Sequence, residues 1–206
     1  MSTQARRRYT LEEYFALELA SDAKYEYFDG EIFNMSGGSP AHEDVIGNIY
    51  SGLKLCVREK GCRVFLSGLR VIVPTQPPYR YPDLTALCDK PRYEKVGGID
   101  ALVNPALIVE VLSPSTEAYD RSDKFTHYKS IESFAEYLLV AQHKPHATHF
   151  IRGEHGVWTH REYNSLEEVL RLSTLDCEMN LRDVYENVEF PPPAPLPFER
   201  PDEAER

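Results

Sequence analysis

The sequence predicts a mixed domain, α/β or α+β, in which helices pack against a central mixed sheet. Its predicted elements follow the order hairpin, helix, several consecutive strands, helix and strand, which is typical of this class. The chain has 206 residues, enough for one sizeable core and short of what two domains usually need. Its hydrophobic content of 42% and charged content of 27% are those of a soluble globular protein.

The N-terminal part of the chain predicts a helix followed by a hairpin. Thr10 and Glu13 have the spacing of a capping box, which predicts a short helix over residues 11–19. The β-prone runs 24–28 and 31–35 are separated by an Asp-Gly pair. Because Asp-Gly favours the tight turns of two-residue hairpins, these two runs are expected to pair with each other.

A second helix is expected to begin at Ser39-Pro40. Ser39 can act as the N-cap, and Pro40 suits the first helical position. His42 lies one turn from this N-terminus, four residues before Ile46, and so on the inward face. It could be a buried, satisfied side chain, or it could point at the edge of the sheet. The apolar stripe with helical spacing consists of Ile46, Ile49, Leu53 and Val57.

The rest of the domain predicts most of the sheet. Its strands are short runs rich in β-branched and aromatic residues, bounded by turn residues. We expect strands at 63–66, 69–73, 81–87, 106–112 and 135–141, a turn at 75–78, a polar loop over 89–104, a helix over 120–132, a hairpin over 146–162 that turns at 153–156, and a short closing helix near 181–187.

The chain is expected to hold one domain, residues 1–189, and a C-terminal tail. From residue 190 the composition becomes rich in Pro and Glu. Such a composition cannot bury a core, so residues 190–206 are predicted to be disordered. No apolar run approaches the roughly 20 residues of a membrane span, so no membrane association is expected.

Charge and cysteine content narrow the function classes. The net charge of −10 argues against indiscriminate nucleic-acid binding, although it leaves room for a local basic face. The four cysteines show no CxxC pairing. Cys56, Cys88 and Cys177 lie in apolar or amphipathic segments, where reduced core cysteines are expected. Reduced cysteines fit the cytoplasm.

Two acidic residues interrupt strands that are predicted to be buried. Asp83 lies in YPDLTAL and Glu110 in PALIVEVLSPST. A buried carboxylate is costly unless a positive charge compensates it. If the two strands are neighbours, both carboxylates can point the same way and share a hard divalent cation such as Mg²⁺ or Mn²⁺. Alternatively, the Pro-Asp step marks a strand edge and Glu110 pairs with an arginine.

The helix after the Glu110 strand offers a lysine to the same site. Asp120, Lys124 and Tyr128 are spaced by four residues and so lie on one helix face. A lysine beside a metal site can orient or deprotonate the attacking water, or neutralise negative charge. The alternative is an ordinary intrahelical pair between Asp120 and Lys124, worth a few tenths of a kcal/mol.

Five segments together resemble a known family. They are YFDGEIFNMSGGSPAH, YPDLTAL, PALIVEVLSPST, DRSDKFTHY and EYLLV, and in this order they resemble the Uma-type endonucleases of the PD-(D/E)XK restriction-endonuclease-like superfamily. The similarity covers residues 9–188. It implies a restriction-endonuclease-like core and metal-dependent hydrolysis of phosphodiester bonds in DNA. It also implies that Asp83 and Glu110 are the metal ligands.

The resemblance extends to other site residues, with one departure. The superfamily commonly places a lysine two residues after the motif acid, where this chain has Leu112. The family pattern has its lysine on the following helix instead, which corresponds to Lys124. The expected active-site residues are therefore Asp83, Glu110, Lys124, Glu31, His42 and Tyr128, with Glu31 and His42 at recurrent positions of less defined role.

Three functions remain open at this point. The first is a magnesium-dependent endonuclease with DNA as its partner. The second is a weakly active or inactive nuclease-fold module that binds nucleic acid or protein. The third is a metal hydrolase of small phosphoesters, which lacks a recognisable phosphate-cradling loop. Because double-strand cleavage needs two active sites and two-fold dimers are the commonest oligomers, a homodimer is expected.

Overall fold

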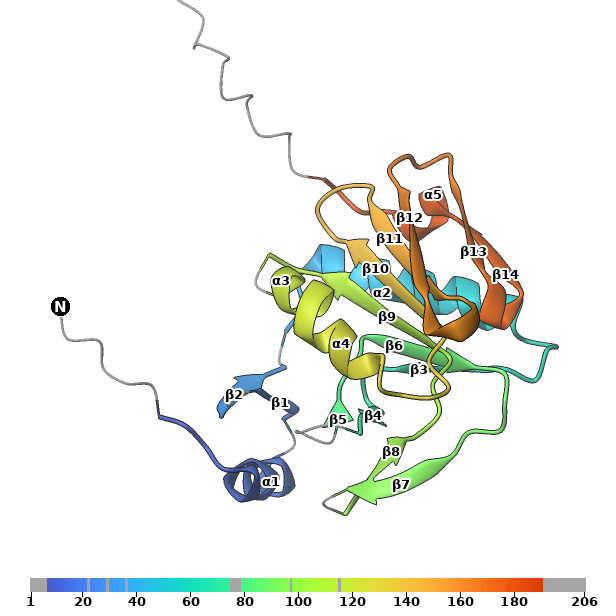
Figure 1. The fold of residues 1–206 in the computed structure, drawn as a ribbon. Helices are drawn as coiled ribbons and strands as arrows, with labels where there is room; N and C mark the ends of the chain where they lie inside the picture. Colours follow the sequence, from blue (N-terminus) through green and yellow to red (C-terminus); the bar gives the residue numbers. More distant parts are fainter. Residues whose placement is uncertain are drawn as a thin grey trace, which may run out of the picture.

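The computed structural model describes residues 7–21, 23–28, 30–35, 37–74, 79–96, 98–114 and 116–190. Helix α1 (Leu11–Ala20) and the hairpin of β1 (Tyr25–Phe28) and β2 (Glu31–Asn34) form a unit at one side of the molecule (Figure 1). Thr10 and Glu13 form the capping box that was predicted. The hairpin is a separate two-stranded sheet.

A six-stranded sheet forms the centre of the fold, in the order β12-β11-β10-β9-β6-β3. Strands β9 and β10 run parallel, and the other neighbours run antiparallel, so the sheet is mixed, as predicted. Every residue of β6, β9 and β10 is buried. The strands are β3 (Arg63–Leu66), β6 (Leu84–Leu87), β9 (Leu107–Leu112), β10 (Glu136–Ala141), β11 (Ala147–Arg152) and β12 (Trp158–Tyr163).

Helices cover both faces of this sheet (Figure 1). Helix α2 (Pro40–Cys56) packs its Val45, Ile49 and Leu53 on the face that contains Val109 and Val111. A second helical segment packs on the opposite face, against Ile108 and Leu112. It consists of α3 (Glu117–Tyr119), a π-helical turn η1 (Asp120–Lys124) and α4 (Phe125–Tyr128).

The alternation along β9 decides which way Glu110 points. Residues 107, 109 and 111 belong to the core under α2, and residues 108 and 112 belong to the core under the second helical segment. Since side chains alternate along a strand, Glu110 shares the face of Ile108 and Leu112. The sheet therefore directs this carboxylate toward the helical segment that contains Lys124.

Two smaller sheets and several short helices complete the fold. One sheet has the order β5-β4-β8-β7, and the other pairs β13 with β14. The elements are β4 (Arg70–Ile72), β5 (Tyr79–Arg80), β7 (Tyr93–Val96), β8 (Ile99–Leu102), β13 (Val169–Leu172), β14 (Cys177–Asn180), α5 (Leu181–Val184) and the 3₁₀ turns η2 (Glu154–Gly156) and η3 (Ser173–Leu175).

The prediction of a polar loop over 89–104 was wrong, because this stretch contains the hairpin β7–β8. Strand β7 is largely exposed, so its charged residues conceal the period-two pattern of a half-buried strand. The strands β13 and β14 were also missed. The helix predicted over 120–132 begins earlier, at Glu117, and ends at Tyr128. The predicted strand 81–87 is shortened to β6.

The cysteines correct another prediction. Cys56 is bonded to Cys177 and Cys62 to Cys88, so the expectation of reduced core cysteines was wrong. Sequence separations of 121 and 26 residues give no local signal of this pairing. The first disulfide joins the C-terminal end of α2 to β14. The expected cytoplasmic location loses the support that it drew from reduced cysteines.

Some predictions fall outside the described residues. These are the turn at 75–78 and residues 191–206 of the predicted tail. Phe190 packs beside Tyr185, with ring centroids 5.2 Å apart. None of the described helices combines the length and the apolar character that a membrane crossing requires.

Candidate active site

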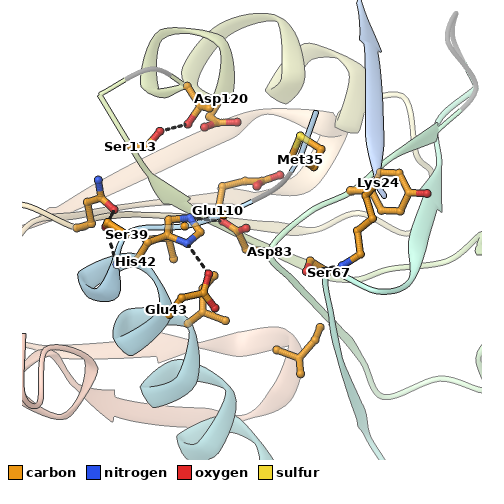
Figure 2. A pocket seen from close by; sticks show the side chains of 18 of the residues that line it. Lys24, Met35, Ser39, His42, Glu43, Ser67, Asp83, Glu110, Ser113 and Asp120 are labelled. Carbon is orange, nitrogen blue, oxygen red and sulfur yellow. Dashed lines mark hydrogen bonds and ion pairs between the residues drawn. The ribbon is translucent and has the colours of Figure 1, made fainter. Parts of the chain in front are cut away.

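Asp83 and Glu110 come from neighbouring strands, as predicted. Strands β6 and β9 pair antiparallel with Leu84 opposite Val109, so Asp83, one residue before β6, falls in register with Glu110. Both residues line one cavity of about 940 Å³ (Figure 2). The Asp83 side chain is 16% exposed, and its Oδ2 accepts a hydrogen bond of 2.7 Å from the backbone N–H of Val111. This bond ties the end of one strand to the other.

Lys124 points into the protein and reaches Glu110. Its Nζ lies 2.9 Å from Glu110 Oε1 and 3.2 Å from Asp120 Oδ1. The Lys124 side chain is only 4% exposed. The intrahelical pair with Asp120 therefore exists, but it is buried and shared with Glu110, which excludes the alternative of an ordinary pair on a solvated helix face.

Tyr128 supports the same carboxylate from the next turn. Its hydroxyl donates a hydrogen bond of 2.9 Å to Glu110 Oε1, and the ring is fully buried. The spacing of four residues predicted that Lys124 and Tyr128 share a face, and both contact Glu110. Between Asp120 and Lys124 the helix adopts a π turn, a feature often found at functional sites.

A third carboxylate completes the surroundings of Lys124. Glu26 of β1 is buried, and its Oε1 lies 3.8 Å from Lys124 Nζ. The same oxygen accepts a hydrogen bond of 2.9 Å from the backbone N–H of Tyr81. The N-terminal hairpin is thereby joined to the segment that leads into Asp83. Sequence reasoning missed Glu26; the available signal was an acid among aromatic residues in the strand YEYF.

Glu31 is not among the described residues that line the cavity. It begins β2 opposite Phe28, at the turn end of the hairpin, whereas Asn34 and Met35 at the other end line the cavity. Of the hairpin acids, it is therefore Glu26 that contacts the lysine. The role expected for Glu31 stays a prediction.

Burial and charge perturb the central groups strongly. Burial raises the pKa of Glu110 well above its usual value, the charges of Asp120, Asp83 and Glu26 add to this, and Lys124 counteracts it. For Lys124, burial lowers the pKa, but the charges of Glu110, Glu26 and Asp120 outweigh burial and hold the pKa well above the usual value. Lys124 is therefore a permanent ammonium group and is unsuited to deprotonating a water.

His42 lies at the cavity beside Asp83 (Figure 2). Its Nε2 is 3.6 Å from Asp83 Oδ2, and its Nδ1 is 3.6 Å from Glu43 Oε1. Burial lowers the pKa of His42, but the nearby carboxylate of Asp83, together with that of Glu43, outweighs burial, so the pKa is raised. Gly38 makes room for this ring, since a Cβ there would lie 2.7 Å from His42 Nδ1.

The acid pair fits a hard divalent cation. Glu110 Oε1 and Asp83 Oδ2 accept the hydrogen bonds described above, and the other oxygen of each carboxylate has no hydrogen-bond partner within the described ranges. Both carboxylates face a cavity with room for water. Mg²⁺ is usually bound by one or two carboxylates and keeps several waters. No group of three or more His, Cys, Asp or Glu side chains in the described part of the chain forms a fuller metal cage.

Comparisons with known proteins show which sequences and structures this chain resembles. Residues 11–182 match a family model described as "Uma2: Putative restriction endonuclease". The chain is 32% identical over 181 residues to the uncharacterized protein slr1290 of Synechocystis sp., covering 87% of this chain and 92% of that protein. It is also 32% identical over 133 residues to the uncharacterized protein sll1609 of the same organism, covering 65% of this chain and 75% of that protein.

A solved structure shares the fold. It is the crystal structure of a "putative nuclease belonging to DUF820" from Anabaena variabilis, and the two superpose with a TM-score of 0.67. The superposition covers 86% of this chain and 97% of that chain, at 17% sequence identity. At this identity the likeness shows the fold, which is the restriction-endonuclease-like fold predicted from the sequence.

Proposed function

The chain belongs to the Uma2 family, whose description is "Putative restriction endonuclease", and we propose that it is a metal-dependent endonuclease that hydrolyses phosphodiester bonds in DNA. One observation carries the proposal. Two carboxylates in register on neighbouring strands, Asp83 and Glu110, face one cavity, and the buried ammonium group of Lys124 lies 2.9 Å from Glu110. This combination suits the attack of water on a phosphodiester, which is an anionic reaction centre.

Asp83 and Glu110 would hold Mg²⁺ or Mn²⁺ through the oxygens that face the cavity. A divalent ion bound there lowers the pKa of a water and stabilises negative charge on a phosphoryl oxygen. The chain's own part is to hold these carboxylates in place. The backbone N–H of Val111 fixes Asp83, and the hydroxyl of Tyr128 fixes Glu110.

Lys124 and His42 take different parts in the proposed reaction. The ammonium group of Lys124 opposes the rise in the pKa of Glu110 that burial causes, and it adds positive charge beside the reacting phosphate. His42 is partly exposed in the cavity and has a raised pKa, so it can hold a proton near neutral pH and exchange it with the reacting groups. Tyr128 acts through Glu110 rather than on the substrate.

A second candidate is a nuclease-fold module that binds nucleic acid or protein without cutting it. The observation in its favour is Leu112, which stands where the superfamily commonly has a lysine. The net charge of −10 also weakens the case for a broad DNA-binding surface. The contact of Lys124 with Glu110 favours the enzyme hypothesis. It places an ammonium group beside Glu110 from η1, in place of the lysine that the superfamily commonly has two residues after this acid.

A cleavage assay separates the two candidates. The purified full chain is incubated with supercoiled plasmid and with circular single-stranded DNA, in Mg²⁺, in Mn²⁺ and in a chelator. The enzyme hypothesis predicts nicking that requires the metal and is lost in Asp83→Ala. Binding of DNA without cleavage, in all metals and on both substrates, would favour the module.

Assembly and location complete the proposal. We expect a homodimer, so light scattering that gives a mass near the 23.6 kDa of one chain would contradict it.

The cytoplasm remains the proposed location, although two disulfides are more usual in oxidising compartments. Fractionation of cells that express the full chain distinguishes the two locations.

A further inference from the structure

Lys124 Nζ lies where carboxylate oxygens from three separate elements converge. Glu110 of β9 is at 2.9 Å, Asp120 of η1 at 3.2 Å and Glu26 of β1 at 3.8 Å. The exposed fraction of all four side chains is 5% or less. Three buried carboxylates therefore surround one ammonium group, an environment that favours a cation at this position.

The carboxylates do not depend on the lysine alone for their positions. Tyr128 donates to Glu110, and the backbone N–H of Tyr81 donates to Glu26. The η1 turn is held by Tyr137, whose hydroxyl donates to the backbone carbonyl of Asp120 at 3.0 Å. If the ammonium group were removed, these contacts would keep the three carboxylates pointing at the vacated position.

Asp120 Oδ1 shows that charge, more than hydrogen bonding, is what this position supplies. The atom is buried and makes no hydrogen bond within the described ranges, yet the Lys124 ammonium group lies 3.2 Å away. Its partner is thus a neighbouring positive charge without hydrogen-bond geometry. A divalent ion, which takes carboxylate oxygens as ligands, could compensate the same oxygen by direct coordination.

The vacated position would also be accessible and of suitable size. Lys124, Asp120 and Glu110 all line the cavity, so a shortened side chain at 124 would open the position to water and ions. Oxygen ligands lie about 2.0–2.1 Å from Mg²⁺. The carboxylates would need to move inward by roughly 1 Å or more from their distances to Nζ, within the reach of side-chain adjustment.

We propose that Lys124 is a tethered cation that occupies the place of a second divalent ion. The native centre then takes one ion, at Asp83 and Glu110, while Glu26 and Asp120 hold the lysine and bind no metal. The count of one ion in the native protein rests on the proposed function. The prediction that a variant without the lysine gains a metal site does not rest on the proposed function, because it depends only on Glu26, Glu110 and Asp120.

The test compares two substitutions of different size. Lys124→Ala removes both the charge and the volume, so it should bind one more Mn²⁺ per chain than the native protein. Lys124→Met removes the charge but fills most of the volume, so it should bind the native number. Calorimetry and metal analysis after dialysis give the stoichiometry, and melting in a chelator and in Mn²⁺ gives a second readout. Mn²⁺ should raise the melting temperature of Lys124→Ala more than that of Lys124→Met.

A further pair of variants locates the added ion. In the Lys124→Ala background, Glu26→Gln keeps an oxygen that can accept from Tyr81 N–H but removes one charge. Asp120→Asn likewise removes one charge from η1 while keeping the shape of the side chain. Each double variant should lose the added ion or bind it at least about tenfold more weakly, a change of about 1.4 kcal/mol. Retention at the same affinity in both would place the ion elsewhere and overturn the proposal.

Other outcomes are also decisive. A folded Lys124→Ala protein with the native stoichiometry would overturn the proposal, and so would an added ion in both Lys124→Ala and Lys124→Met. A Lys124→Ala protein that stays unfolded in saturating Mn²⁺ would contradict it, since the ion should replace the ammonium group. If the native protein binds no ion and Lys124→Ala binds one, the proposed native metal site fails while the tethered-cation proposal stands.

Discussion

At the scale of single residues, the centre is governed by the cost of burying charge. Asp83 and Glu110 were predictable because each interrupts an apolar strand, a conflict visible in the sequence itself. The contact of Lys124 with Glu110 was only one of two open alternatives, since the spacing of four fits an exposed pair equally well. Glu26 was missed, because the acid in YEYF was only a weak signal and its burial depends on how the hairpin packs against Tyr81.

The role of Lys124 predicts a loss of turnover and, because three buried carboxylates lose their cation, a loss of stability as well. Lys124→Met should lower the cleavage rate by about 10²–10⁴-fold, the range typical of losing a positioned acid–base or charged group. Binding of Mn²⁺ at Asp83 and Glu110 should persist. Single-turnover cleavage of plasmid at saturating Mn²⁺ measures the first effect, and calorimetry the second. An unchanged cleavage rate would remove Lys124 from the catalytic centre.

The pKa of His42 predicts a dependence on pH that Asp83 controls. The folded protein raises this pKa, so it favours the protonated ring. The ion pair between protonated His42 and Asp83 therefore stabilises the folded protein. This stabilisation is complete below pH values of about 6.5, the pKa of His42 in the unfolded chain, and is lost as pH rises through the pKa of His42 in the folded protein.

An NMR titration of the His42 ring measures the effect. Without added metal, Asp83→Asn should shift the midpoint to lower pH, because the charge of Asp83 is removed and burial remains. His160, whose side chain is 58% exposed, serves as the internal control and should keep its midpoint. The same midpoint for His42 in both proteins would show that Asp83 does not set its pKa.

At the scale of elements, local signals predicted most of the site's supports. The Thr10 capping box, the predicted pairing of β1 with β2 and the Ser39-Pro40 start of α2 are all present. Elements without local periodicity were missed, as β7 and β8 show, because β7 is largely exposed and only the second half of β8 is buried, so neither carries a clear apolar pattern. How α1 and its hairpin attach to the sheet also depends on long-range contacts.

One such contact predicts how strongly α1 is attached. Glu18 of α1 is buried, and its Oε2 lies 3.2 Å from Arg70 Nη1 of β4 and accepts a hydrogen bond of 2.8 Å from Tyr81. Arg70→Met leaves the Glu18 carboxylate buried without its cation, so the free energy of unfolding should fall by about 3–5 kcal/mol. Urea denaturation measures this loss.

A matched control uses an arginine on another strand. Arg171 of β13 pairs with Glu178 at 3.3 Å, and both side chains are exposed. Arg171→Met should change the free energy of unfolding by about 0–1 kcal/mol. Similar losses in Arg70→Met and Arg171→Met would show that the burial of the Glu18 pair does not govern the attachment of α1.

At the scale of the whole molecule, the sequence predicted the mixed sheet and its flanking helices, and the structure and its solved relative share the restriction-endonuclease-like fold. The pair of Cys56 and Cys177 was beyond prediction, because the two residues are 121 residues apart and meet only in the folded chain. Their disulfide ties the helix that carries His42 to the C-terminal part of the domain.

This cross-link predicts a stability that depends on redox conditions. The double variant Cys56→Ser/Cys177→Ser should lose about 2–4 kcal/mol of unfolding free energy relative to the oxidised native protein, because a long loop is no longer closed in the unfolded chain. With excess reductant the two proteins should become similar in stability. Equal stability without reductant would mean that the pair is not bonded in solution.

In the proposed reaction, Asp83 and Glu110 together hold one catalytic divalent ion. Calorimetric titration of Mn²⁺ into the native protein, Asp83→Asn and Glu110→Gln tests this, because both substitutions keep the side-chain shape and remove one charge. We expect one ion per native chain and at least about tenfold weaker binding in each variant, or about 1.4 kcal/mol. Equal affinity in all three proteins, or no binding by the native protein, would contradict it.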